Sequence, residues 1–186
     1  MIKEELSAFF RLHLKNKKRL LLGFSGGEDS RVLLDLCFNH LRNWSGTLYV
    51  IHIDHQWRKE SFEQAQKLQK IVEEEYQLPF FLKQVSPPKN SGNWEDESRQ
   101  KRFESFVEVY QDLKCEALLL AHHSEDVAET TLKRVFEKSS LEKLHGPKGI
   151  HQLLGMEVWR PLINTSKKMI SKYVQEKFLS ILGEEV

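Results

Sequence analysis

The chain has 186 residues, enough to bury a sizeable core in one domain and too few for two full domains. Its 28 basic and 27 acidic side chains give a formal net charge of +1, which excludes a global field that attracts nucleic acid or anionic lipid. The two cysteines are widely separated in the sequence, which predicts a reduced, cytoplasmic protein. No apolar run approaches the roughly 20 residues that span a bilayer, so we expect no membrane anchor.

Short apolar runs alternate along the chain with longer stretches whose apolar residues recur every three or four positions. This alternation predicts βα units. Runs such as Leu20-Leu21-Leu22 are apolar on both faces, which suits parallel strands covered by helices on each side. The predicted fold is therefore a doubly wound α/β domain with a parallel sheet. In chain order we expect a helix at 3–14, a strand at 19–24, a helix at 30–42, a strand at 47–54, a helix at 59–76, a strand at 79–85, a helix at 94–113, a strand at 116–121, and helices at 125–138 and 167–181.

Three segments do not fit this alternation. Residues 86–92 and 139–149 are rich in proline, glycine, serine and lysine, and we expect both to be loops. Residues 150–162 have β character, and we expect them either to close the sheet or to form a small hairpin.

The first predicted strand ends directly in the hexapeptide Ser25-Gly26-Gly27-Glu28-Asp29-Ser30. In a parallel α/β sheet, ligands bind beyond the carboxyl ends of the strands. We expect Gly26 and Gly27 to adopt positive φ, so that their amides approach an anion. The helix that starts near Ser30 aims its free amides at the same place, and the two serines add hydroxyl donors. The pattern predicts a loop that binds phosphate.

Asp29 is the informative residue of this loop. A carboxylate beside a polyphosphate repels it unless a divalent cation lies between them, so we infer magnesium. The alternative is a simple strand-to-helix turn, in which Asp29 stabilises the first helical turn by about 0.3–1 kcal/mol. The loop lacks the lysine of a Walker motif, which disfavours transfer of a terminal phosphoryl group.

The hexapeptide resembles the PP-loop of N-type ATP pyrophosphatases, which cleave ATP between the α- and β-phosphates and transfer AMP to an oxygen of the substrate. Further segments at 52–58, 93–103, 122–130 and 159–162 are similar to the catalytic domain of tRNA(Ile)-lysidine synthetases. The resemblance implies a Rossmann-like fold of the adenine nucleotide hydrolase type. It also implies that ATP adenylates the wobble cytidine of an isoleucine tRNA, and that the ε-amine of free L-lysine then displaces AMP to form lysidine.

The resemblance, together with the position of each motif, assigns candidate site residues. Asp29 is expected to bind magnesium and to act in catalysis. The other expected catalytic residues are Arg99, Arg102 and His122. ATP is expected to contact Ser25, Gly26, Gly27, Glu28, Asp29, Ser30, Asp54 and His55. The lysine substrate is expected at Asp126 and Glu129, and tRNA at Arg58, Lys133, Arg134, Lys143 and Lys148.

Several of these assignments have structural alternatives. Spacings of four and three place His122, Asp126 and Glu129 on one helical face, but a solvated acidic face capped by Ser124 has the same pattern. Arg99 and Arg102 lie three apart and are expected to face one ligand, although either also suits a surface ion pair. A lone His55 is ordinarily a capping or packing residue, and Arg160 before Pro161 suits a simple anchor.

We interpret residues 1–186 as a single catalytic domain, without the C-terminal tRNA-binding domains that such synthetases usually carry. This domain alone is expected to bind tRNA weakly, with strong salt dependence. Three other functions remain open: a tRNA thiolase, for which Cys37 and Cys115 are poorly suited, an amidating synthetase, and an ATP-binding module without chemistry. A lysidine synthetase should release pyrophosphate only with lysine and a cytidine-bearing anticodon. This dependence would distinguish it from all three alternatives.

Overall fold

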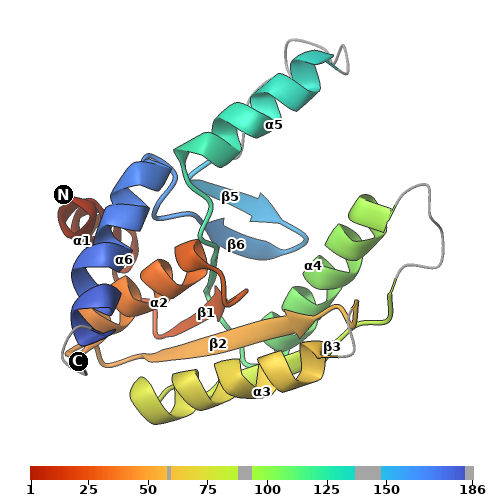
Figure 1. The fold of residues 1–186 in the computed structure, drawn as a ribbon, viewed down its shortest axis with the longest axis horizontal. Coiled ribbons are helices and arrows are strands. Elements are labelled where there is room, and N and C mark those ends of the chain that lie inside the picture. Colours follow the sequence, from red (N-terminus) through yellow and green to blue (C-terminus); the bar gives the residue numbers. More distant parts are fainter. Residues whose placement is uncertain (58–59, 88–93, 137–147, 183–186) are drawn as a thin grey trace.

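The computed structural model describes residues 1–57, 60–87, 94–136 and 148–182. Its centre is a six-stranded sheet with the order β3-β2-β1-β4-β6-β5 (Figure 1). The strands are β1 (Arg19–Gly23), β2 (Thr47–Asp54), β3 (Phe80–Gln84), β4 (Ala117–Leu119), β5 (Ile150–Leu153) and β6 (Met156–Trp159). All neighbours pair parallel except β5 and β6, which are antiparallel. The α/β prediction is confirmed, and the antiparallel edge is formed by the segment for which a hairpin was one expectation.

The helices lie where the apolar periodicity predicted them, and their ends agree within two residues, except that the α-helix expected at 59–76 ends at Lys70. They are α1 (Ile2–His13), α2 (Glu28–Leu41), α3 (Ser61–Lys70), α4 (Trp94–Asp112), α5 (Ser124–Phe136) and α6 (Lys167–Leu182). A short π-helix, η1 (Ile71–Glu75), continues α3. Within the ranges that the structure describes, no helix has both the length and the apolar character needed to cross a membrane.

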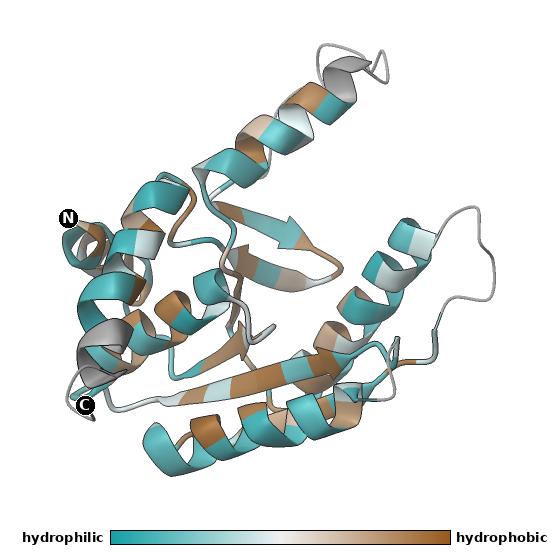
Figure 2. Cartoon of the chain, viewed as in Figure 1, coloured by the Kyte–Doolittle hydropathy of each residue, from teal (hydrophilic) through white to brown (hydrophobic). Residues whose placement is uncertain are grey.

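Both faces of the sheet are covered, as the apolar strands predicted. Leu20 and Leu22 of β1 are buried with residues of α1, α2 and α6 on one face, and Leu21 is buried with residues of α4 on the other. Figure 2 shows hydrophobic residues along the central strands and hydrophilic residues on the outer faces of the helices. Opposite side chains of one strand thus enter two separate cores, which is the doubly wound arrangement.

The segment after residue 149 satisfies both expectations for it at once. β5 and β6 form a hairpin, and β6 also pairs with β4, so that the hairpin extends the sheet. The turn contains Leu154 and Gly155, which have φ of 50° and 78°. Of the two predicted loops, 86–87 and 148–149 lack helix or strand, and 88–92 and 139–147 lie outside the described residues.

The two cysteines are free and buried, as a reduced protein requires. Burial raises the pKa of both thiols, in the case of Cys115 to about 12. Neither side chain therefore offers a thiolate at neutral pH, which is the form that carries sulfur or binds a cluster. This agrees with the sequence argument against a thiolase.

The strand order reverses direction at β1, whose neighbours are β2 on one side and β4 on the other. The chain proceeds from β1 through β2 to β3, then crosses back to β4 on the opposite side. Such a switch point leaves a crevice at the carboxyl ends of the two central strands. The residues that follow β1 and β4 are therefore the ones that the fold brings together.

Candidate active site

A cavity of about 460 Å³ lies at this switch point, and its walls include the ends of β1, β2 and β4. Apolar side chains such as Ile51, Phe106 and Leu120 form part of its lining. Seven residues that the sequence assigned to the site also line it: Ser25, Asp29, Ser30, His55, Arg102, His122 and Asp126. The fold thus gathers groups from four separate segments around one cavity.

The glycine pair of the loop is only half as predicted. Gly26 has φ of +80°, and a Cβ there would lie 2.7 Å from the side chain of Leu68, so this position requires glycine. Gly27 instead has φ of −73° with extended ψ, and it is the N-cap of α2. The prediction of positive φ at Gly27 is wrong, because α2 begins at Glu28, two residues earlier than expected.

The early start of α2 shapes the anion site. No side chain caps the N-cap Gly27, so the first-turn amides of α2 lack a side-chain partner within the described part of the chain. Ser30 is buried and donates to the Gly27 carbonyl at 2.9 Å, and its Oγ lies 3.0 Å from that of Ser25. Ser30 therefore braces the loop, whereas Ser25 is exposed at the cavity. The arrangement fits a phosphate-binding helix N-terminus.

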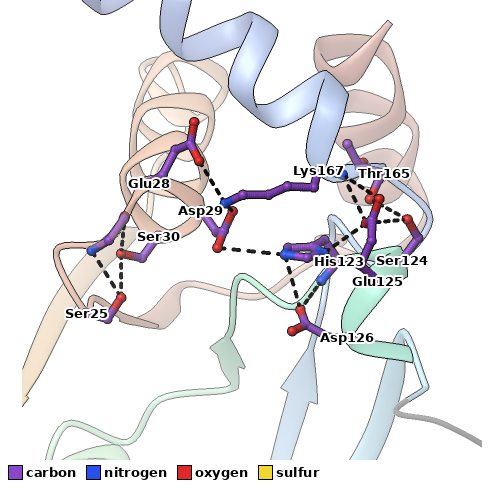
Figure 3. Close-up of polar contacts among 11 residues, drawn as sticks. Ser25, Glu28, Asp29, Ser30, His123, Ser124, Glu125, Asp126, Thr165 and Lys167 are labelled. Atoms are coloured by element: carbon purple, nitrogen blue, oxygen red, sulfur yellow. Dashed lines mark hydrogen bonds and ion pairs between the residues drawn. The ribbon is translucent and has the colours of Figure 1, made fainter. Parts of the chain in front are cut away.

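Asp29 is held by a lysine that the sequence analysis missed. Lys167, the first residue of α6, donates from Nζ to Asp29 and forms a 2.8 Å ion pair with Glu28 (Figure 3). Burial opposes the charge on Lys167, but its hydrogen bonds to Asp29 and Glu28 raise its pKa above the ordinary value. The negative charge of the Asp29 carboxylate, from which we inferred magnesium, is thus already compensated by the ammonium group of Lys167. These residues are 138 positions apart, and no local pattern links them.

A second histidine, His123, joins the two carboxylates of the site. Its Nε2 lies 3.8 Å from Oδ2 of Asp29 and 3.7 Å from Oδ2 of Asp126 (Figure 3). Its backbone amide donates to the same Asp126 oxygen at 2.7 Å, which is one half of a capping box for α5. Asp126 therefore both caps the helix and lines the cavity. The sequence signal for His123 was its place between a strand and the helix that follows.

Several predicted site residues do not line the cavity, namely Glu129, Arg99, Asp54 and, within the loop, Gly26, Gly27 and Glu28. Glu129 is exposed and does not line it, because α5 extends away from the sheet beyond its first turn (Figure 1). His122 precedes α5, so the expected shared helical face of His122, Asp126 and Glu129 does not exist. Arg99 is also exposed and outside the lining, whereas Arg102, one turn later on α4, lines the cavity.

Two buried polar atoms support a ligand at this cavity. Nε of Arg102 and Nδ1 of His55 are buried and have no hydrogen-bond partner among the described residues. Burial lowers the pKa of both side chains, so the protein does not compensate either group on its own. A buried donor without a partner is costly, and an anionic or carbonyl ligand satisfies it.

Aromatic residues that the sequence analysis did not assign lie beside these groups. The ring of His55 is stacked on that of Trp57 at 5.1 Å, and Trp57 meets Trp94 edge to face at 5.6 Å. Trp57 lines the cavity and remains 55% exposed. A half-exposed indole at the mouth of a cavity is suited to contact with a planar ring of a ligand.

Asp54, which the sequence assigned to ATP, lies behind the cavity, where its side chain supports the turn after β2. It is buried, accepts a 2.9 Å hydrogen bond from the amide of Gln56 and lies 3.3 Å from the amide of Gln84. Burial opposes ionisation, but these and other hydrogen bonds still lower its pKa. Asp54 does not line the cavity, because its side chain closes the turn after β2.

The residues expected to contact tRNA are only partly described. Lys133 is exposed and lies 3.7 Å from Glu95, and Lys148 is exposed near the hairpin. Arg58 and Lys143 lie outside the described residues, and so does the side chain of Arg134. The structure therefore leaves the predicted tRNA contacts as predictions.

Among the described residues, no group of three or more histidine, cysteine, aspartate or glutamate side chains is arranged to hold a metal ion. Magnesium commonly takes only one or two protein carboxylates and completes its shell with phosphate oxygens and water. The single carboxylate of Asp29 is enough for this mode of magnesium binding. Its Oδ1 is bonded to Lys167, and its Oδ2 lies beside His123.

Comparison with known proteins agrees with this geometry. The family model described as a PP-loop domain matches residues 1–182. The tRNA(Ile)-lysidine synthase of Chlamydia muridarum is 36% identical over 169 residues, which is 90% of this chain and 51% of that protein. The enzyme of the same name from Chlamydia pneumoniae is 32% identical over 97% of this chain and 55% of its own length. The chain thus spans about half the length of the curated relatives it matches.

Solved structures share the fold at lower identity. A U34-tRNA thiolase from Methanococcus maripaludis superposes with a TM-score of 0.76 at 17% identity, covering 94% of this chain and 62% of that one. A glutamine-dependent NAD+ synthetase from Acinetobacter baumannii superposes with a TM-score of 0.63 at 12% identity, covering 95% of this chain and 32% of that one. The loop, the switch-point cavity and the family match lead to one conclusion: the chain belongs to the PP-loop domain family.

Proposed function

We propose that this chain is the catalytic domain of a tRNA(Ile)-lysidine synthase. In this reaction ATP adenylates the wobble cytidine of an isoleucine tRNA, and free L-lysine displaces AMP. The observation that carries the proposal is that the PP-loop and Asp126 line one cavity, so that a nucleotide and an amine substrate meet there. The named relatives support it over the domain that they share with this chain.

ATP supplies the adenylyl group, and the loop is built to hold its phosphates. The uncapped amides at the start of α2 and the Ser25 hydroxyl offer donors, and Lys167 adds a positive charge beside them. Arg102 offers a buried Nε that lacks a partner among the described residues. These donors are fixed before the substrate binds, so they stabilise charge that develops on phosphate oxygens without reorganising.

Magnesium would be held by Asp29 together with phosphate oxygens. The carboxylate has one oxygen bonded to Lys167, which leaves Oδ2 for a metal. The metal would neutralise phosphate charge and so assist departure of pyrophosphate. This magnesium requirement and the cytoplasmic location expected from the sequence both belong to the proposal.

The lysine substrate would bind through its ammonium group at Asp126. Asp126 lines the cavity and Glu129 does not, so the proposal assigns the ammonium to Asp126 alone. The ammonium must lose a proton before its nitrogen attacks C2 of the cytosine. We assign the role of proton acceptor to His123, because its Nε2 lies 3.7 Å from Oδ2 of Asp126, the carboxylate to which the proposal assigns the ammonium.

Pyrophosphate release by the chain with ATP, magnesium, L-lysine and an isoleucine tRNA transcript tests the proposal. Release should require the tRNA, and a transcript with uridine in place of the wobble cytidine is the matched control. The formation of lysidine is detected by mass spectrometry of the digested tRNA, and it should also require L-lysine. ATP binding without any tRNA-dependent release would favour a non-catalytic module.

A further inference from the structure

Arg160 lies behind the wall of the cavity, directly after β6. It is 2% exposed, and its Nε donates a 2.8 Å hydrogen bond to Nδ1 of His122. Its Nη1 donates to the carbonyl of Lys148 at 3.0 Å and lies 2.8 Å from Nδ1 of His151. Since His122 lines the cavity and Arg160 does not, the arginine contacts the site through the imidazole.

This contact restricts the tautomer of His122. A guanidinium carries only N–H donors and stays protonated at neutral pH, so the nitrogen that faces it must present a lone pair. Nδ1 of His122 is therefore unprotonated, and the single proton of a neutral ring resides on Nε2. Nε2 is the ring nitrogen that remains for a ligand.

The surroundings also keep the ring uncharged. Burial lowers the pKa of His122 to about 4, and the charge of Arg160 is the next largest cause. Asp126 opposes this shift, and the more distant charges of Arg102 and Arg99 add to it. Arg160 itself remains charged, although burial and Arg99 lower its pKa to about 10.

We propose that Arg160 is a positioning residue that holds His122 as the neutral Nε2–H tautomer, so that the ring offers the substrate a hydrogen-bond donor without a positive charge. The inference rests on the proposed function only for the identity of the acceptor, a non-bridging oxygen of the transferred phosphoryl group. A neutral donor gains strength as negative charge develops on that oxygen, which favours the transition state over bound substrate.

The tautomer is measured directly on the chain with 15N-labelled histidine, without ATP, lysine or tRNA. Two-bond proton–nitrogen spectra distinguish a protonated from an unprotonated ring nitrogen, and His122→Gln assigns the signals. We expect Nδ1 unprotonated and Nε2 protonated between pH 5.5 and pH 8, a range above the pKa of about 4. A protonated Nδ1, or a ring that titrates in this range, would overturn the proposal.

Arg160→Met removes the donors while keeping much of the side-chain volume. The His122 signals should then report mixed tautomers, and the ring should titrate closer to the ordinary value of 6.5. His151→Gln is the matched control, because His151 also contacts Arg160 but does not line the cavity. If Arg160→Met fails to fold, Arg160→Leu, which also lacks N–H donors, is interpreted in the same way. A folded variant with an unchanged His122 tautomer and titration would refute the positioning role.

Kinetics separates this inference from the proposed function. In Arg160→Met, kcat for pyrophosphate release should fall about tenfold or more while the KM for ATP changes less than about twofold. A wild-type chain that shows the expected tautomer but no tRNA-dependent release would contradict only the proposed function. An active enzyme with the other tautomer would contradict only the role of Arg160.

Discussion

Helix α2 carries two aspartates that are each paired with a lysine of α6, yet the two pairs differ in almost every physical respect. Asp35 near the middle of α2 has a side chain that is 4% exposed, and its partner is Lys177. Asp29 in the first turn has a side chain that is 33% exposed, and its partner is Lys167. The Asp35–Lys177 pair lies in the core, where no ligand reaches it, and it anchors α6 to α2. Asp29 of the other pair lines the cavity, where a ligand can reach it.

The partners of Asp35 explain why it is an anchor. Tyr173 donates to Oδ2 at 2.5 Å, and Asn39 donates to the same oxygen at 3.0 Å. Tyr76 lies 3.5 Å from Oδ1. Burial and the nearby Asp35 charge raise the pKa of both phenols, so both remain donors at neutral pH. A buried carboxylate with this many partners fixes α6 against α2 and leaves no room for a ligand.

The largest effect on stability is expected when the ion pair between Asp35 and Lys177 is broken. Asp35→Asn should lower the free energy of unfolding by about 3 kcal/mol, at the lower end for a broken buried pair because Lys177 is partly exposed. Urea unfolding followed by circular dichroism measures it, with the exposed Asp112→Asn as control. A loss below about 1 kcal/mol would remove the distinction between the two aspartates.

Asp29→Asn should show the reverse pattern. Its ion pair is partly exposed and contributes under about 1 kcal/mol to stability, so the unfolding midpoint should hardly move. Pyrophosphate release should fall about 100-fold or more, because a ligand for magnesium among the phosphates is lost. Turnover equal to that of the unmodified chain would count decisively against the proposed site.

Asp126→Asn and Glu129→Gln form a matched pair on α5. Asparagine keeps the oxygen that caps His123 but loses the charge, so the KM for L-lysine should rise about tenfold while that for ATP stays within about twofold. Glu129→Gln should leave both KM values within about twofold, since Glu129 is outside the cavity. Initial rates at varied lysine and ATP measure both. A larger effect at Glu129 than at Asp126 would reverse the assignment.

The smallest effect is expected at Lys167, the lysine bonded to Asp29. Lys167→Met should raise the KM for ATP about fivefold, equivalent to about 1 kcal/mol, because it removes one partly exposed charge beside the phosphate loop. Lys168→Met, at the next and exposed position, is the control. Equal KM values for the two variants would show that Lys167 only neutralises Asp29 and does not act on the nucleotide.

Local sequence patterns predicted the features that depend on neighbouring residues. The apolar runs predicted the first four strands as separate elements, and the β character of residues 150–162 covered the other two. The periodicity predicted each α-helix within the described residues. The loop 25–30 was found because glycine and serine residues that follow a strand indicate an anion site. The conformation of Gly27 differs from the expected one because α2 begins two residues earlier than predicted. Helix propensity does not define a helix boundary to within two residues.

The sequence by itself determined the two-sided sheet, the helices between its strands and the position of the phosphate loop, because each is encoded in a local pattern of apolar, glycine and serine residues. Only the tertiary structure placed Lys167 and His123 beside Asp29 and Arg160 beside His122, and only it left Glu129, Arg99 and Asp54 outside the lining of the cavity. Lys167 and Asp29 are 138 residues apart, and Arg160 and His122 are 38 apart. Their pairing depends on how helices and strands dock in three dimensions, for which side-chain type and spacing carry no signal.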